Sequence, residues 1–216
     1  MDTMMLPTHA LAGMALAVPV VFVAPEFAGV ALVAGLAGGV APDLDMYAGH
    51  RRAFHYPVYL PALSGIAVVV AALIPAAATV GTATFLLAAA VHSVSDVGGG
   101  GLELRPWEAR ADRAVYDHYR DRWLAPRRWI RYDGSPEDLL LSAVIAAPLL
   151  VVPGGVFRGL VVAILAVAVA YTALRRTLPE IAVVLVNRIP RELREYVPSR
   201  YLEGSGESTL SPARAD

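Results

Sequence analysis

The sequence predicts an all-α fold: a polytopic membrane helix bundle of about six transmembrane helices in three hairpins, with an additional amphipathic interfacial helix. Composition is the first observation, because 56% of the 216 residues are hydrophobic and only 17% are charged, whereas soluble domains carry about 25% charged residues. The second is that residues 1–96 hold only seven charged side chains: Asp2, Glu26, Asp43, Asp45, Arg51, Arg52 and Asp96. The alternative is a soluble bundle with an Ala- and Val-rich core, but such long uncharged stretches cannot easily cover a soluble surface.

Apolar stretches along the chain define the predicted helices. A bilayer core needs about 20 apolar residues per helix, so the shorter stretches would require local thinning of the bilayer. The predicted hairpins are residues 10–24 with 28–41, the two halves of 56–95 around a turn at 75–81, and 139–152 with 160–174. Residues 177–190 are apolar but contain Glu180 and Arg188, which favours a helix lying at the membrane interface.

The arginines orient these helices. Arg51 and Arg52 follow the second predicted helix, eight arginines lie between Arg105 and Arg131 after the fourth, and Arg175 begins the segment after the sixth. Basic residues concentrate on the cytoplasmic side of membrane proteins. The sequence therefore predicts a multi-pass protein of the cytoplasmic (inner) membrane, with both termini and the polar loops in the cytoplasm.

A single membrane-embedded domain is predicted over residues 1–202, followed by a disordered tail at 203–216 that is rich in Gly, Ser and Glu. Its cytoplasmic loop, residues 97–137, is rich in Arg and Trp. An apolar stripe recurs there every four residues and predicts a helix that lies flat at the lipid headgroups: Trp107, Ala111, Val115, Tyr119 and Trp123. The basic cluster at 127–131 could bind lipid phosphates, or it could be the ordinary positive-inside signal with aromatic anchors.

Ionisable residues gather at matching ends of the first four predicted helices. They are His9 in the first, Asp43 and Asp45 in the second, His50 and His55 before the third, and His92 and Asp96 in the fourth. Ionisable groups at membrane depth are costly and usually face a bundle interior or a watery cavity. His92 and Asp96 share one helix face. Asp43 and Asp45 follow a proline, in a predicted extended turn where both can point at one cation.

These residue types favour a divalent metal ion at the cytoplasmic face. The chain has no cysteine, so the ligands must be imidazole, carboxylate, backbone or water. Imidazole with carboxylate suits zinc, the expected ion, while carboxylate with water suits magnesium or manganese. Each residue taken alone could instead be an interface histidine, a turn residue or a support for an imidazole. His118, the fifth histidine, is predicted to be a solvated surface residue.

The ordered motifs resemble a known family. Pro-Thr-His-x-x-x-Gly, Pro-Asp-x-Asp, His-Arg-x-x-x-His and His-x-x-x-Asp occur in this order between residues 7 and 106, similar to the LexA-binding, inner-membrane-associated metal-dependent hydrolase family. The resemblance implies a membrane-bound hydrolase with a divalent metal bound through His9, Asp43, Asp45, His50, His55, His92 and Asp96. A more distant likeness to zinc-dependent phospholipase C and its nuclease relatives points toward phosphoester substrates. Neither likeness extends past Pro106, and no LexA-binding surface is recognised.

The expected function is therefore metal-dependent hydrolysis at the cytoplasmic membrane face, in which the metal activates a water molecule. Asp96 or Asp45 would take the proton, and Arg51 or Arg52 would steady an anionic phosphate or leaving group. Membrane lipid is the expected partner, with an anionic lipid or another phosphoester as substrate; nothing indicates nucleic acid or supports a soluble protein partner. The alternatives are a membrane scaffold or partner-docking protein with a structural metal, and a metal or proton transporter. The transporter is less favoured, because no acid or histidine falls in the middle of a predicted helix.

Overall fold

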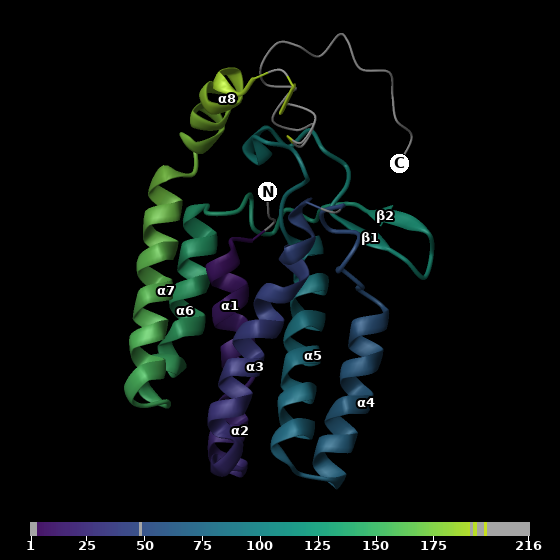
Figure 1. Cartoon of the computed structure of the whole chain (residues 1–216), viewed down its shortest axis with the longest axis vertical. Helices are drawn as coiled ribbons and strands as arrows, with labels where there is room; N and C mark the ends of the chain where they lie inside the picture. The colour runs from purple at the N-terminus through teal and green to yellow at the C-terminus, as the bar shows by residue number, and fades with distance from the viewer. Residues whose placement is uncertain (1–3, 48, 191, 194–196, 198–216) are drawn as a thin grey trace.

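The computed structural model describes residues 4–47, 49–190, 192–193 and 197. Helices lie side by side along the long axis of the molecule, and the polar connections gather at one end (Figure 1). In chain order the helices are α1 (Leu6–Ala15), α2 (Val18–Val23), α3 (Ala28–Val40), α4 (Tyr59–Leu73), α5 (Ala77–Ser95), α6 (Pro136–Val151), α7 (Gly155–Leu174) and α8 (Leu178–Arg188). The predicted tail at 203–216 lies outside the described residues.

Four helical segments are long and apolar enough to cross a membrane: Leu6–Val23, Pro25–Met46, Ala77–Gly98 and Gly155–Leu174. The prediction of a membrane-type helix bundle is confirmed at this level. The other two predicted spans form the shorter helices α4 and α6, of 15 and 16 residues. At 1.5 Å per residue these helices are about 22–24 Å long, less than the roughly 30 Å hydrocarbon core.

Small residues bring α1 and α3 into close contact. A Cβ atom on Gly13 would lie 2.0 Å from the carbonyl oxygen of Gly35, and one on Gly39 would lie 2.3 Å from the carbonyl oxygen of His9. Glycine at such positions lets two helix backbones approach each other in a membrane. α1 also packs against α5, α6 and α7, and α4 packs against α5. The start of α1, which carries His9, is therefore held inside the bundle.

A β-hairpin occupies part of the polar loop where a helix was predicted. Strands β1 (Val115–Asp117) and β2 (Arg122–Leu124) pair antiparallel, with Tyr116 opposite Trp123, and both lie at the polar end (Figure 1). The predicted helix over residues 107–123 is wrong. A spacing of four residues keeps side chains on one face of a helix, but four is also a multiple of the two-residue period of a strand. The turn needs a positive φ at Asp121, which a regular helix would not allow.

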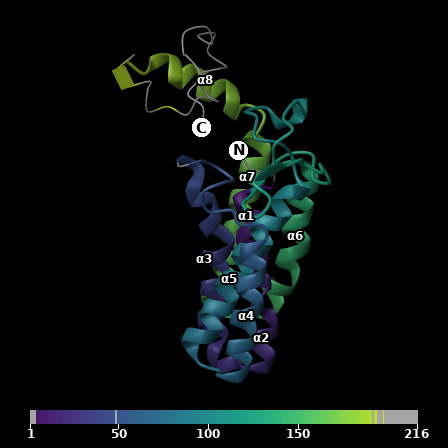
Figure 2. The same cartoon turned by 90° about the vertical axis from the view of Figure 1, so that its right-hand side faces the viewer.

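The helix predicted over residues 177–190 is present as α8. Figures 1 and 2 place it at the end of the bundle where α1 begins, turned away from the bundle axis. Its exposed side chains include Ile181, Val184 and Leu185, while Glu180 and Arg188 lie at its two ends. The predicted helix is therefore present, and its position at the membrane interface stays a prediction.

Candidate metal centre

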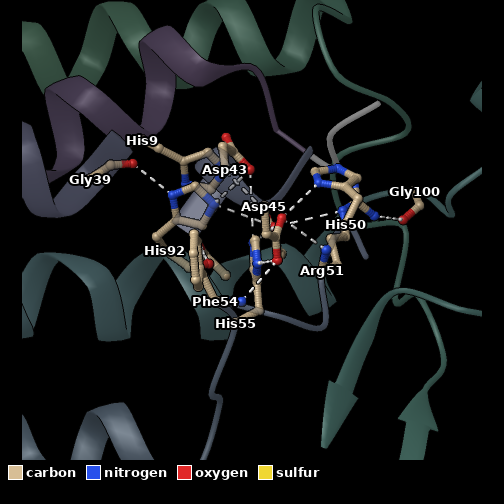
Figure 3. Close-up of polar contacts among 12 residues, drawn as sticks. His9, Gly39, Asp43, Asp45, His50, Arg51, Phe54, His55, His92 and Gly100 are labelled. Atoms are coloured by element: carbon tan, nitrogen blue, oxygen red, sulfur yellow. Dashed lines mark hydrogen bonds and ion pairs between the residues drawn. The ribbon is translucent and has the colours of Figure 1, made fainter. Parts of the chain in front are cut away.

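Residues from four separate segments meet at the polar end of the bundle (Figure 3). α1 supplies His9, and the end of α5 supplies His92, with Asp96 in the following turn. Asp43 and Asp45 lie in a 3-10 helix, Ala41–Tyr47, that continues α3. This is a correction to the predicted extended turn, and it arises because the chain keeps its helical direction through Pro42. His50, Arg51 and His55 come from the loop between this 3-10 helix and α4.

Four of these residues form the core of the candidate site. Asp43, His55, His92 and Asp96 each offer one ligand atom, and the four atoms lie within 4.8 Å of one another. The Nε2 atom of His55 is 3.2 Å from Oδ2 of Asp96, and Nε2 of His92 is 3.3 Å from Oδ1 of Asp43. None of the four residues is more than 6% exposed. Two imidazoles and two carboxylates therefore converge in a volume closed to bulk water.

Several of the converging atoms have no hydrogen-bond partner in the described part of the chain. They are both carboxylate oxygens of Asp43 and the Nε2 atoms of His55 and His92. These nitrogen and oxygen atoms are thus close to one another without forming hydrogen bonds. Leaving a buried polar group unsatisfied costs about 1–3 kcal/mol, and neighbouring carboxylates repel unless positive charge lies between them. A bound divalent cation would satisfy all of these atoms, so the donor set fits a metal ion.

The other nitrogen of each core imidazole is held by an acceptor. Nδ1 of His92 lies 2.6 Å from the carbonyl oxygen of Gly39, and Nδ1 of His55 lies 3.0 Å from Oδ2 of Asp45. A carbonyl oxygen can only accept, so Nδ1 of His92 donates and its Nε2 lone pair points toward Asp43. Metal-binding histidines usually have their second nitrogen fixed by a carbonyl or carboxylate in this way. Gly39 was not anticipated from the sequence, because its role depends on its backbone oxygen alone.

The pKa of His55 shows the balance of forces on this imidazole. Burial lowers the pKa of His55, but the neighbouring carboxylates of Asp45 and Asp96 outweigh it, so the pKa lies above its ordinary value. The carboxylates therefore favour a positive charge at this position. A metal cation and a proton would compete for the same nitrogen, because a metal ligand must be a neutral imidazole.

Asp45 lies beside the four core residues and organises the loop that follows it. Its Oδ1 accepts the backbone N–H of Arg51 at 3.2 Å and contacts Nδ1 of His50 at 3.1 Å. Its Oδ2 accepts the backbone N–H of Phe54 at 3.0 Å as well as the contact from His55. Both oxygens are therefore engaged. Of the predicted ligands, the structure places Asp45 and His50 next to the core and not within it.

His9 borders the core from the side of α1. Its ring stacks on the ring of His92, with centroids 3.7 Å apart, and its Nε2 lies 3.0 Å from Oδ1 of Asp96. Asp96 is consequently shared, since one oxygen faces His9 and the other faces His55. All seven predicted ligands thus lie in one place, with four at the centre and three at its edge.

Comparison with known proteins found no family model, no curated protein and no solved structure that matches this chain. What the site can do is therefore inferred from its own residues.

A single buried arginine lies against the core. Arg51 is fully buried, its Nε is 3.7 Å from Oδ2 of Asp96, and its Nη1 donates to the carbonyl oxygen of Gly100 at 3.4 Å. Its backbone adopts a φ of 61°, a left-handed conformation that costs a non-glycine residue about 1–2 kcal/mol. A strained backbone at a buried cation beside the core suggests that the position of this guanidinium matters.

The β-hairpin holds this loop in place, a role that the sequence did not suggest. The backbone N–H of Tyr116 donates to the carbonyl oxygen of Arg51 at 3.0 Å, and Nε2 of His118 lies 2.6 Å from the carbonyl oxygen of Arg52. The guanidinium of Arg52 lies over the ring of Tyr116, 4.5 Å from its centroid. His118 is therefore a half-buried contact of the loop, outside the group of converging ligands.

Proposed function

We propose that this chain is a membrane-embedded metal-dependent hydrolase whose site lies at the cytoplasmic face of the inner membrane. The observation that carries the proposal is the set of buried atoms without hydrogen bonds on Asp43, His55 and His92, which converge with Asp96. The fixed Nδ1 atoms of both histidines support it. Two imidazoles and two carboxylates suit zinc best, with manganese or magnesium as alternatives.

Each residue has a role in the proposed reaction, in which a phosphoester or a related substrate is hydrolysed. A divalent cation at the core would act as a Lewis acid and lower the pKa of a water molecule to about 7. We assign Asp96, one of the two core carboxylates, to accept the proton of that water. The oxygens of Asp45 are already engaged, so we assign it to orienting His55 and the loop. The guanidinium of Arg51 would bind an anionic substrate oxygen, because arginine forms paired hydrogen bonds with phosphate.

The proposal includes six passes with both termini in the cytoplasm. The connections that carry the arginines, together with α8, gather at one end of the molecule, while the short turns within the three hairpins lie at the other (Figure 1). This arrangement agrees with the positive-inside rule. α4 and α6 would cross where the bilayer is locally thinned, a modest cost per ångström of mismatch.

The first experiment tests catalysis directly. Asp43→Asn and Asp96→Asn should abolish turnover of a phosphoester panel by the zinc-loaded protein in mild detergent, while thermal stability stays near that of the wild type. Asp45→Asn, a third variant, should also abolish turnover, and it should lower stability because both oxygens of Asp45 accept backbone N–H groups. Asparagine keeps the size and one acceptor but removes the charge that a metal needs, and removing charge near the membrane should not impair insertion. Asp112→Asn, on an exposed side chain of the polar loop, is the control and should retain full activity.

The full burial of the core favours a second candidate, a membrane scaffold with a structural metal. His55 and Asp96 are 0% exposed, so a substrate could reach them only after the loop moved. The binding energy of a structural metal is also folding energy. In that case Asp43→Asn and Asp96→Asn should lower thermal stability and metal content together. Absence of turnover by the metal-loaded wild type, combined with that loss of stability, would replace the hydrolase with the scaffold.

A further inference from the structure

A second buried polar cluster lies next to the metal centre and is not part of it. It contains Asp138 and Ser142 of α6 and Thr8 of α1, each no more than 2% exposed. Thr8 immediately precedes His9. Successive side chains leave a helix about 100° apart, so Thr8 contacts α6 while His9 contacts the end of α5.

The carboxylate of Asp138 is the centre of this cluster. Its Oδ2 accepts the backbone N–H groups of Met5, at 2.7 Å, and Gly134, at 2.9 Å, and its Oδ1 accepts the hydroxyl of Thr8 at 2.6 Å. Because Thr8 gives its only proton to Asp138, the hydroxyl of Ser142 donates to Thr8 at 2.7 Å. Every one of these donors is therefore paired.

These contacts fix α1 in two respects. Met5 is the N-cap residue of α1 and has no side-chain cap of its own, so its bond to Asp138 fixes the depth at which the helix begins. A carboxylate is also favourable at a helix N-terminus, where the helix dipole is positive. The bond from Thr8, one position along, fixes the rotation of α1 about its axis. On the neighbouring α3, Gly39 packs against the carbonyl oxygen of His9 with no room for a Cβ atom.

We infer that Asp138 is a positioning residue of the metal centre, which acts through Thr8 to place His9. The inference rests on the proposed metal site. His9 stacks on His92 and lies 3.0 Å from Oδ1 of Asp96, whose Oδ2 faces the core. A small rotation of α1 would move His9 away from Asp96 and release that carboxylate. The α6–α7 hairpin contributes no residue to the site. Through Asp138 it nevertheless helps to determine where the ligands lie.

The test uses the full-length protein in mild detergent with Co²⁺ as the probe, since its visible absorption reports ligand geometry. Thr8→Val removes only the hydroxyl, Thr8→Ser keeps it, and Asp138→Asn keeps the size of the carboxylate. We expect Thr8→Val and Asp138→Asn to weaken Co²⁺ binding about 10–100-fold, the usual effect of losing an outer partner of a metal site, and to change the absorption band at saturation. Thr8→Ser should restore both properties.

A matched control separates positioning from general stability. Asp133, in the same loop before α6, forms a buried ion pair with Arg175 at 2.8 Å and accepts the hydroxyl of Tyr171 on α7. Asp133→Asn should lower thermal stability and leave Co²⁺ affinity and absorption as in the wild type. In addition, Thr8→Val should weaken Co²⁺ binding little further when His9 is already replaced by alanine. The effects of two substitutions do not add when one residue acts through the other.

The outcomes are distinct. Wild-type affinity and absorption in Thr8→Val and Asp138→Asn, with only the stability reduced, would overturn the inference and leave the metal centre standing. Fully additive effects of Thr8→Val and His9→Ala would overturn it too. If Asp138→Asn fails to fold, the Thr8 variants decide. A wild type that binds no Co²⁺ would overturn the metal centre and the inference together.

Discussion

At the scale of single residues, the candidate site depends on which nitrogen of each histidine faces the core. Gly39 and Asp45 hold the Nδ1 atoms of His92 and His55, so that both Nε2 atoms face Asp43 and Asp96. A histidine held in this way loses little freedom when it binds a metal. Orienting groups of this kind typically contribute about 10–100-fold to metal affinity.

The two histidines with the most different surroundings give a direct test. We expect the purified wild type to hold at least one divalent ion, and His92→Ala to lose it, because one of four converging ligands is removed. His118→Ala should retain it, since His118 contacts the carbonyl oxygen of Arg52 and the rings of Tyr56 and Tyr116, away from the core. Elemental analysis after gel filtration in mild detergent measures the metal content of each variant. Equal metal content in both variants and the wild type would exclude the core as the binding site.

The sequence predicted which residues lie close together, but not which of them are ligands at the core and which lie at its edge. His9, His55 and His92 look alike in the chain, and each lies near an end of an apolar segment. Whether an imidazole is a ligand or a neighbour depends on its direction, which for His92 and His55 is set by contacts with Gly39 and Asp45. One of these acceptors is a backbone carbonyl, which no side-chain motif can reveal.

At the scale of elements, the close approach of α1 and α3 brings His9 within reach of Asp96. The backbones meet at Gly13, Gly35 and Gly39, so the distance between the helices is set by the absence of side chains. The sequence contains these glycines, but glycine is also common in membrane helices for other reasons. Their pairing across two helices could not be predicted from one sequence.

Two glycines of the same helix make a matched pair for testing this contact. A Cβ on Gly35 would lie 2.2 Å from the carbonyl oxygen of Gly13, whereas a Cβ on Gly29 would meet nothing within 4 Å. Gly35→Ala should therefore reduce the free energy of unfolding by about 1–3 kcal/mol, as overpacking does, and lower metal content. Gly29→Ala should be neutral or stabilising by up to about 1 kcal/mol, from helix propensity.

Thermal unfolding in detergent and metal content measured together provide the readout. A Gly35→Ala protein as stable and as metal-loaded as Gly29→Ala would show that α1 and α3 can separate without cost to the site.

The polar loop shows where element prediction failed and why. The spacing of Trp107, Val115 and Trp123 fits a helix and also fits the alternation of a strand. The strand form is stabilised by the segment that carries Arg51, because the N–H of Tyr116 donates to the carbonyl oxygen of Arg51. That partner lies more than sixty residues earlier in the chain. By contrast, the apolar helices follow from composition alone, because each can satisfy its own backbone hydrogen bonds.

At the scale of the whole molecule, the two ends of the bundle differ in character. The candidate site, the β-hairpin and α8 lie at one end, and the turns that close the three hairpins lie at the other (Figure 1). The arginines that follow α3, α5 and α7 therefore all lie at the end of the site. Four segments are long enough to cross a membrane. The protein would therefore have four passes if only these segments cross, or six passes if α4 and α6 cross as well.

Reporter fusions distinguish these two arrangements. With six passes, fusions after residues 52, 120 and 176 should report the cytoplasm, and fusions after residues 26, 78 and 154 should report the opposite side. The physical reason is that arginines resist transfer across the membrane and concentrate in the cytoplasmic loops. If α4 and α6 do not cross, each helix would have to lie on one side of the membrane, although α4 packs along the membrane-spanning α5 and α6 packs along α1 and α7.

A fusion after residue 52 that reports the outside would overturn the orientation, and with it the cytoplasmic position of the site. If fusions at 52 and 78 both reported the cytoplasm, α4 would be a half-membrane helix, and the correct count would be below six.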